Sequence, residues 1–461
     1  MAMNLALDKF TSMKDVEKKF DMVILGLGKT GISCARFFSG RNQVLALMDS
    51  RMHPPGLETA KKNFPGIPIY LGSFDQNILN SARELIVSPG IAVTDPAISM
   101  ASRAGVSVAG DIEIFCRHVT RPIVAVTGSN GKSTVATLIH RMIEASGRTA
   151  KLGGNIGTPA LDLLQGPEPE FYVLELSSFQ LETTSSLDAA AAVVLNISED
   201  HMDRYANLQE YAIAKFRIYD GTGTLVINLD DRMVAAFSRK SRKNICFTAT
   251  EPGKNSFGIR ELHGDKVIAY GDTVICPIKD IPLQGRHNIS NILAALALGT
   301  AIGLPMQGML AGMRDFQGLP HRCQWLKRIN DVDWYNDSKG TNVGASCAAI
   351  EGLAGDNNLI LIAGGDGKGA DFSPLSAAAA GRVRAAILIG RDAQRLADVL
   401  HAVTAVYFAL DMYAAVRLAH EQSRPQDIVL LSPACASLDM FTDYQHRGAV
   451  FAEAVARIER E

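Results

Sequence analysis

The apolar residues of this chain fall into short runs rich in β-branched side chains, which alternate with segments that have the 3.6-residue period of a helix. The runs cover residues 22–25, 43–48, 123–126, 172–176, 191–197, 359–363, 386–389 and 428–431, with one more near Asp333. Strands that alternate with helices in this way form largely parallel sheets with helices on their faces. The pattern therefore predicts an α/β fold.

The runs form three groups, which predict three domains. Residues 1–110 open with a strand, a Gly-rich turn, a helix from about Ser33 and a second strand, the beginning of a Rossmann-like domain. Residues 111–318 contain a second Gly-rich loop, which predicts a central P-loop-type ATPase domain with a parallel sheet. Within that domain, residues 251–282 lack a helical period and predict a small β-rich part before a helix near 291–302. Residues 319–461 again alternate strands with Ala-rich helices, which predicts a Rossmann-like C-terminal domain.

Composition adds to this picture only by excluding several classes of protein. The chain has 46 Lys and Arg residues against 48 Asp and Glu residues, so its net charge of −2 favours neither nucleic acid nor an anionic membrane. The N-terminal residues lack the basic start and apolar middle of a signal peptide, and no apolar run reaches the ~18 residues of a membrane span. The seven cysteines show no C-x-x-C spacing and are expected to be buried free thiols. We therefore expect a cytoplasmic protein that neither binds nucleic acid nor inserts into a membrane.

The first candidate for a functional site is a Gly-rich loop at residues 127–134. It reads TGSNGKST and lies between an apolar strand and a helical pattern. Its two glycines let the backbone fold so that N–H groups point at phosphate oxygens, and Lys132 adds a positive charge. The Ser133 hydroxyl is suited to bind Mg²⁺. Val126 stands where the commonest P-loop has its first glycine, so this loop is a compressed variant. The pattern predicts an ATP site.

A lysine interrupts the apolar stripe of a second predicted helix. The stripe consists of Leu208, Tyr211, Ala212, Lys215 and Tyr219. From the helical pattern alone, the favoured interpretation is a lysine whose stem lies along the apolar face while its amine reaches water. The alternative is that burial lowers the pKa of the amine, so that a neutral amine is available to react.

Several segments, in the expected order along nearly the whole chain, resemble the Mur ligases and the folylpolyglutamate synthetases, whose ATP loop reads G-x-x-G-K-[ST]. They are the loop at 127–134, ELSSFQL at 175–181, DHMDRY at 200–205, GRHN at 285–288 with Asn291, and DSKGTN at 337–342. Among the Mur ligases, residues 341–344 and 431–439 resemble the members that add D-glutamate.

This resemblance implies an ATP-dependent amide-bond ligase of peptidoglycan precursor synthesis. The carboxylate of UDP-N-acetylmuramoyl-L-alanine would be activated by ATP as an acyl phosphate and coupled to D-glutamate. Mg²⁺, expected at two positions, would be the cofactor. In this family the lysine that matches Lys215 carries a CO₂-derived carbamate, which holds the second Mg²⁺. The implied partners are small molecules, and a monomer is expected.

The resemblance also implies roles residue by residue. Catalysis is assigned to Lys132, His201, Lys215 and Lys339. The metal ligands are Ser133, Glu175, His201 and Lys215. The ATP site consists of Gly128, Asn130, Gly131, Lys132, Ser133, Thr134, Asn291, Arg322 and Asp337. The UDP-sugar site consists of Gly28, Lys29, Thr30, Asp49, Ser50, Arg51, Ser88 and Asn155. The D-glutamate site consists of Thr341, Lys368, Ser437, Leu438 and Tyr444.

Two alternatives stay open. Residues 26–31 read GLGKTG, a complete G-x-G-x-x-G followed at the expected spacing by Asp49, which taken alone predicts an NAD site. A nucleotide-sensing regulator could therefore use this turn as its working site. With a separate ATP loop present, the resemblance favours a turn that holds the diphosphate of a UDP-sugar. The other alternative is a folylpolyglutamate synthetase-type ligase. In either ligase, residues 318–320 are the candidate hinge for closure of the third domain.

Overall fold

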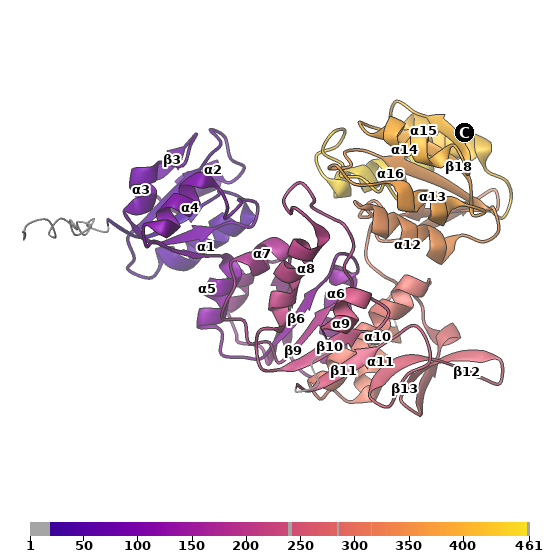
Figure 1. The fold of residues 1–461 in the computed structure, drawn as a ribbon, viewed down its shortest axis with the longest axis horizontal. Coiled ribbons are helices and arrows are strands. Elements are labelled where there is room, and N and C mark those ends of the chain that lie inside the picture. The colour runs from indigo at the N-terminus through magenta and orange to yellow at the C-terminus, as the bar shows by residue number, and fades with distance from the viewer. Residues whose placement is uncertain (1–18, 238–241, 284, 315, 459–461) are drawn as a thin grey trace, which may run out of the picture. The chain divides into compact units, whose positions relative to one another are not determined.

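A computed structural model describes residues 19–237, 242–283, 285–314 and 316–458 (Figure 1). These residues fold into two compact units. The first contains the described residues up to His118 together with Glu182–Thr184, and the second contains the rest. The α/β fold is confirmed in both units, because parallel strands alternate with helices throughout.

The first unit is built on a five-stranded parallel sheet in the order β3-β2-β1-β4-β5. Its elements are β1 (Phe20–Leu25), α1 (Lys29–Ser39), β2 (Leu45–Asp49), α2 (Leu57–Asn63), β3 (Ile69–Leu71), α3 (Gln76–Asn80), β4 (Ala82–Val87), α4 (Pro96–Arg103), β5 (Ser107–Ala109) and α5 (Asp111–His118). The prediction that the first helix begins near Ser33 is wrong, since α1 begins at Lys29. Gly31 makes this early start possible, because a Cβ there would lie 1.7 Å from the carbonyl oxygen of Gly26.

The second unit contains a nine-stranded sheet in the order β14-β13-β12-β11-β10-β9-β6-β8-β7. Its strands are β6 (Ile123–Thr127), β7 (Ala150–Gly154), β8 (Phe171–Glu175), β9 (Ala191–Val194), β10 (Thr224–Asn228), β11 (Asn244–Phe247), β12 (Ser256–Leu262), β13 (Asp265–Tyr270) and β14 (Thr273–Pro277). Strands β6 to β12 pair in parallel, whereas β13 and β14 pair antiparallel. The β-rich part expected at residues 251–282 is therefore confirmed.

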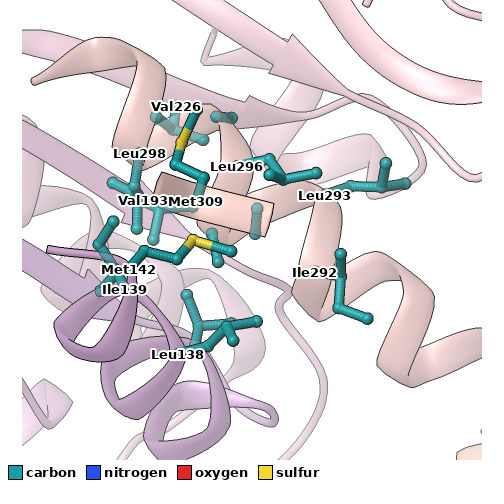
Figure 2. Close-up of a cluster of buried hydrophobic side chains, with 14 of the residues drawn as sticks. Leu138, Ile139, Met142, Val193, Val226, Ile292, Leu293, Leu296, Leu298 and Met309 are labelled. Carbon is teal, nitrogen blue, oxygen red and sulfur yellow. The ribbon is translucent and has the colours of Figure 1, made fainter. Parts of the chain in front are cut away.

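The helices that accompany this sheet along the chain are α6 (Lys132–Ala145), α7 (Ser178–Glu182), α8 (Leu208–Phe216), α9 (Arg232–Ala236), α10 (Arg286–Ala301) and α11 (Met306–Arg314). Of these, α6, α10 and α11 contribute to a large apolar cluster with the strands. Figure 2 shows side chains of α6, α10 and α11 gathered against β9 and β10; the labelled residues are Leu138, Ile139, Met142, Val193, Val226, Ile292, Leu293, Leu296, Leu298 and Met309. This packing fixes α6, and with it the Gly-rich loop at its N-terminus, against the strand ends.

The same unit contains a six-stranded sheet in the order β15-β16-β20-β17-β18-β19, in which only β15 is antiparallel. Its elements are β15 (Gln324–Ile329), β16 (Val332–Asn336), α12 (Val343–Leu353), β17 (Leu359–Gly364), α13 (Ser373–Ala379), β18 (Val383–Ile389), α14 (Ala393–Leu400), β19 (Ala405–Phe408), α15 (Met412–Gln422), β20 (Ile428–Leu431) and α16 (Tyr444–Ile458). An apolar cluster lies on each face of the sheet, as in a doubly wound fold.

Two further expectations need correction. The strand expected at 191–197 ends at Val194, because the next residues leave the sheet and Asn196 instead hydrogen-bonds the Gly-rich loop. The seven cysteines are free, but only Cys34 and Cys435 are fully buried; the other five are half-buried. Within the described ranges, no helix has the length and apolar character needed to cross a bilayer.

Candidate active site

The Gly-rich loop between β6 and α6 is held in a conformation that depends on glycine. Gly128 and Gly131 have φ values of +150° and +84°, and a Cβ on Gly131 would lie 2.3 Å from Oδ1 of Asn291. Side chains from outside the loop fix its two central residues. The hydroxyl of Ser129 donates to the carbonyl of Ser198 at 2.9 Å, and the amide of Asn130 donates to Asn196 at 2.8 Å. The loop therefore has a conformation suited to binding phosphate through its backbone N–H groups.

Two lysines donate to one carbonyl of this loop. Nζ of Lys132 lies 2.8 Å from the oxygen of Gly128, and Nζ of Lys215 lies 2.9 Å from the same atom. Lys215 is 1% exposed, so the interpretation that its amine reaches water is wrong. Its helix packs the amine inward, over the ring of Tyr211 at 4.5 Å. Burial, followed by the charge of Lys132, holds the pKa of Lys215 well below its ordinary value. Burial also lowers the pKa of Lys132.

A hydroxyl and a carboxylate meet beside the loop. Ser133 donates to Oε2 of Glu175 at 2.5 Å, and Glu175 stands at the end of β8. Asn155 donates to the other carboxylate oxygen at 2.9 Å, and Arg322 donates to the Ser133 hydroxyl at 2.5 Å. Ser133, which is expected to bind metal, thus accepts a hydrogen bond from Arg322 and donates one to Glu175.

These residues fit the Mg²⁺ that accompanies a nucleotide. Such an ion is usually held by one or two protein oxygens, with the rest of its ligands from phosphate and water. Ser133 and Glu175 offer the required hard oxygens at the mouth of the loop. No group of three or more His, Cys, Asp or Glu side chains suited to a metal occurs in the part of the chain that the structure describes. The donor set therefore matches a phosphate-completed site better than an all-protein one.

His201 lies in a second cluster, centred on Asp200. The His201 backbone is left-handed, with φ +60°, and its Nε2 is 3.7 Å from the Asp200 carboxylate. Nζ of Lys368 is 3.4 Å from the same carboxylate, and Asn342 donates to it at 3.2 Å. Burial raises the pKa of Asp200, but the charges of His201, Lys368 and Lys132 outweigh burial and hold the pKa below its ordinary value. Burial lowers the pKa of His201, which favours the neutral ring that can bind a metal.

A cavity of about 320 Å³ lies between the loop, α10, α12 and the residues that precede α12. Most residues expected to bind ATP line it: Asn130, Gly131, Thr134, Asn291, Arg322 and Asp337. Lys339 lines the cavity too, and burial lowers its pKa to about 8. Burial raises the pKa of Asp337 to about 6, although Ser432 and the amide of Cys323 both donate to this carboxylate. The cavity therefore combines phosphate-binding and polar groups in one place.

The residues expected to bind D-glutamate are only partly brought together. Thr341 and Lys368 line one small cleft with Asp200 and His201. Ser437 is buried, whereas Leu438 is 73% exposed and belongs to neither described cavity. Tyr444 begins α16, and its ring lies 4.1 Å from Nζ of Lys339. The structure thus brings two of the five residues together, and the role of all five in binding D-glutamate stays a prediction.

The residues expected to bind a UDP-sugar are divided between the two units. In the first unit, Gly28, Lys29 and Thr30 form the turn into α1, Ser88 donates to the carbonyl of Gly26 at 3.3 Å, and Ser50 is exposed. Both oxygens of Asp49 are occupied: Arg51 donates to each, at 2.8 and 2.7 Å, and the Leu27 amide donates at 2.7 Å. Asn155 belongs to the second unit, where it binds Glu175.

Comparison with known proteins decides the family. Three family models match successive parts of the chain: a Mur ligase MurD-like N-terminal domain at residues 20–110, a Mur ligase middle domain at 126–299, and a Mur ligase glutamate ligase domain at 321–435. The chain is a Mur ligase.

Individual relatives agree with this assignment. The Mur ligase described here is 52% identical to a UDP-N-acetylmuramoylalanine--D-glutamate ligase from Nitrosococcus oceani, over 95% of this chain and 96% of that protein. It is 49% identical to a protein of the same name from Coxiella burnetii, over 94% and 98% of the two chains. Among solved structures, the alanine ligase MurC from Thermotoga maritima shares the fold, with a TM-score of 0.59 and 16% identity over 95% of this chain and all of that one.

Sequence reasoning missed several residues that organise the site of this Mur ligase. Asn196, Ser198 and Asn342 hold the Gly-rich loop through their side chains or backbone, yet none of them was expected there. Asp200 stood in a segment that resembles the family but was given no role. A signal for Asn342 did exist, because an Asn directly before a helical segment is a strong N-cap candidate. The contacts with residues far away along the chain had no signal.

Proposed function

We propose that this chain is the ligase that adds D-glutamate to UDP-N-acetylmuramoyl-L-alanine at the expense of ATP, through an acyl phosphate. The observation that carries the proposal is the convergence of a phosphate loop with the half-buried Lys132, the buried Lys215 and a polar cavity. The names of the relatives that are about half identical to it provide the substrates.

In the first step, the L-alanine carboxylate attacks the γ-phosphorus of ATP, and ADP leaves. The chain's part in this step is to hold the phosphates in place and to balance their charge. Loop amides and Lys132 would do so, with Lys132 exchanging the carbonyls of Gly128 and Ser129 for phosphate oxygens. Mg²⁺, bound through Ser133 and Glu175, would neutralise further negative charge.

Lys215 would act as a carbamate. A neutral amine attacks CO₂ and releases one proton, which turns a cation into an anion able to hold a second Mg²⁺. Support comes from the complete burial of Lys215 and from its lowered pKa, which favours the neutral amine that this addition needs. His201, whose pKa burial also lowers, would be its neighbour at that ion.

In the second step, the amine of D-glutamate attacks the acyl carbon, and the tetrahedral intermediate releases phosphate. An incoming dicarboxylate needs two anion sites, which Lys368, Thr341 and Ser437 would provide. Leu438 and Tyr444 would complete the pocket. Because water also attacks an acyl phosphate, the site must close around it.

The structure gives one argument against a nicotinamide cofactor. An NAD site of this type needs a free carboxylate for the ribose hydroxyls, but Arg51 and the Leu27 amide occupy both oxygens of Asp49. The same turn can still bind a diphosphate through its backbone, which suits a UDP-sugar.

The deciding experiment measures ADP release with Mg-ATP and UDP-N-acetylmuramoyl-L-alanine in the presence of D-glutamate, L-glutamate, L-lysine, meso-diaminopimelate or L-alanine. We expect turnover with D-glutamate alone. Turnover with another acceptor would support the proposed mechanism but contradict D-glutamate as the acceptor. Folded protein that is inactive with all five but active with a folate substrate would instead be a folylpolyglutamate-type ligase.

A further inference from the structure

Asn342 joins the six-stranded sheet to the phosphate loop. It is the N-cap of α12, where its Oδ1 accepts a hydrogen bond from the amide of Ala345 at 2.8 Å. Its Nδ2 donates to Oδ1 of Asn130 in the phosphate loop at 3.1 Å, and Asn130 donates back at 3.3 Å. Asn342 is only 5% exposed, so these bonds form out of water, where their loss is costly.

The same amide also contacts a charged group. Nδ2 of Asn342 lies 3.2 Å from one carboxylate oxygen of Asp200, and Nζ of Lys368 lies 3.4 Å from the other. Thr341, which precedes Asn342, lines the cleft beside them. The segments that carry Thr341 and Lys368 are therefore fastened, through Asn342 and Asp200, to the residues that shape the phosphate loop.

We call the contact of Asn342 with Asn130 and Asp200 the joint. Its close packing depends on the absence of a side chain at Gly344. A Cβ on Gly344 would lie 2.9 Å from the hydroxyl of Ser198 and 3.6 Å from Nδ2 of Asn130. Ser198 in turn holds the loop through Ser129. Gly344 thus allows the first turn of α12 to lie directly against the loop's supports.

We propose that Asn342 is a positioning residue that keeps the amino-acid-binding segments seated on the phosphate loop while the acyl phosphate exists. The inference rests on the proposed function, because it concerns the fate of that intermediate. Attack by the amine forms the C–N bond and expels phosphate, with loss of one amine proton. Attack by water forms a C–O bond instead, expels phosphate and regenerates the carboxylate, so that ATP and water become ADP and phosphate. A loosened joint favours the second outcome.

The test uses the full chain and two substitutions at the joint. Asn342→Ser keeps a good N-cap but is too short to bridge Asn130 and Asp200. Gly344→Ala places a methyl group against Ser198 and Asn130, and so disturbs the same contact from another position. The matched control is Asp411→Ala, which removes an N-cap of the same 2.8 Å geometry from α15, outside the described cavities. Each variant is assayed for amide formed per ADP released, for the KM of D-glutamate and for thermal stability.

We expect the wild type to form one amide per ADP. Asn342→Ser and Gly344→Ala should form markedly fewer while ADP release continues, and should raise the KM of D-glutamate by about tenfold, as for the loss of a hydrogen bond to a charged group. Asp411→Ala should keep the wild-type ratio. An unchanged ratio of amide to ADP in both joint variants would overturn the inference. An equal fall of this ratio in Asp411→Ala would also overturn it, because the effect would then come from the loss of a helix cap. Absence of amide in the wild type would instead reject the proposed function.

Discussion

At the residue scale, Lys215 shows how burial lowers the pKa of a lysine amine. A charged amine in an apolar setting would cost several kcal/mol, so the folded protein favours the neutral form. The carbonyl oxygen of Gly128 accepts a hydrogen bond from this amine and another from the amine of Lys132. The two amines therefore lie close together, and the charge of Lys132 adds to the burial that lowers the pKa of Lys215.

Replacement of this lysine tests its role directly. Lys215→Ala should lower turnover by about a hundredfold or more, as expected when a preorganised electrostatic group is removed from an active site. Lys151→Ala is the matched control, because Lys151 is a half-buried lysine of the same unit that also donates to backbone carbonyls, at 2.9 and 2.6 Å. Steady-state ADP release measures both. Partial recovery of Lys215→Ala by acetate or formate would support a carbamate, whereas full activity without them would reject it.

Asp337 provides a pH-dependent prediction for stability. Its pKa is raised to about 6 by burial, against 3.8 in the unfolded chain, so the folded protein holds this proton more tightly. Stability is therefore fully present below pH 3.8 and is lost as the pH rises through 6. The loss amounts to about 3 kcal/mol, at ~1.4 kcal/mol per pKa unit. Asp337→Asn should avoid that loss, and its advantage should grow between pH 4 and pH 7.

Tryptophan fluorescence is a suitable probe, since both tryptophans, Trp325 and Trp334, lie on β15 and β16 beside Asp337. Urea unfolding of nucleotide-free protein across this pH range gives the comparison. Asp333→Asn, on β16 just before Asp337, is a control of opposite sign: hydrogen bonds from Arg328 lower the pKa of Asp333, so its stabilisation is lost as the pH falls. An advantage of Asp337→Asn that is the same at every pH would contradict the assignment.

At the element scale, α1 depends on one close backbone contact. A Cβ on Gly31 would meet the carbonyl of Gly26 at 1.7 Å, and a carbonyl cannot rotate aside as a side chain can. Gly31→Ala should therefore destabilise the first unit by about 3 kcal/mol, the upper end for overpacking. Gly28→Ala is the control, because a Cβ there has no neighbour within 4 Å. Hydrogen exchange of the β1 amides reports the stability. Equal exchange rates in the two variants would show that the contact is unimportant.

Elements with a strong period or a distinctive loop were predictable, and short or mixed ones were not. The apolar runs that became β1, β6, β8, β17 and β20 and the β-rich part were confirmed, since each is rich in the apolar β-branched or aromatic residues that favour strands. Strands such as β7, which reads AKLGG, carry no such signal. The Gly-rich loop was predictable because its chemistry is local. The joint between Asn130, Asp200 and Asn342 was not, because it depends on how distant segments pack.

At the scale of the whole molecule, the proposed reaction needs a site that opens for substrates and closes over an acyl phosphate. The candidate hinge begins at Gly318, whose φ of +97° suits glycine and strains any other residue. Arg322, a few residues later, reaches across to Ser133 at 2.5 Å. Movement about residues 318–320 would therefore couple directly to the hydroxyl proposed to bind Mg²⁺.

A paired substitution separates a hinge from ordinary backbone strain. Gly318→Ala and Gly303→Ala both force alanine into a left-handed conformation, since Gly303 has φ +76°, and each should lower stability by about 1–2 kcal/mol. Only Gly318→Ala should also lower kcat, by about tenfold if a strain of ~1.4 kcal/mol must be overcome in each closure. Steady-state kinetics with saturating substrates measures the difference. If both variants lose the same stability and kcat is unchanged in both, the domain must close by bending the chain at another place. The contact between Arg322 and Ser133 would then form without a change at Gly318.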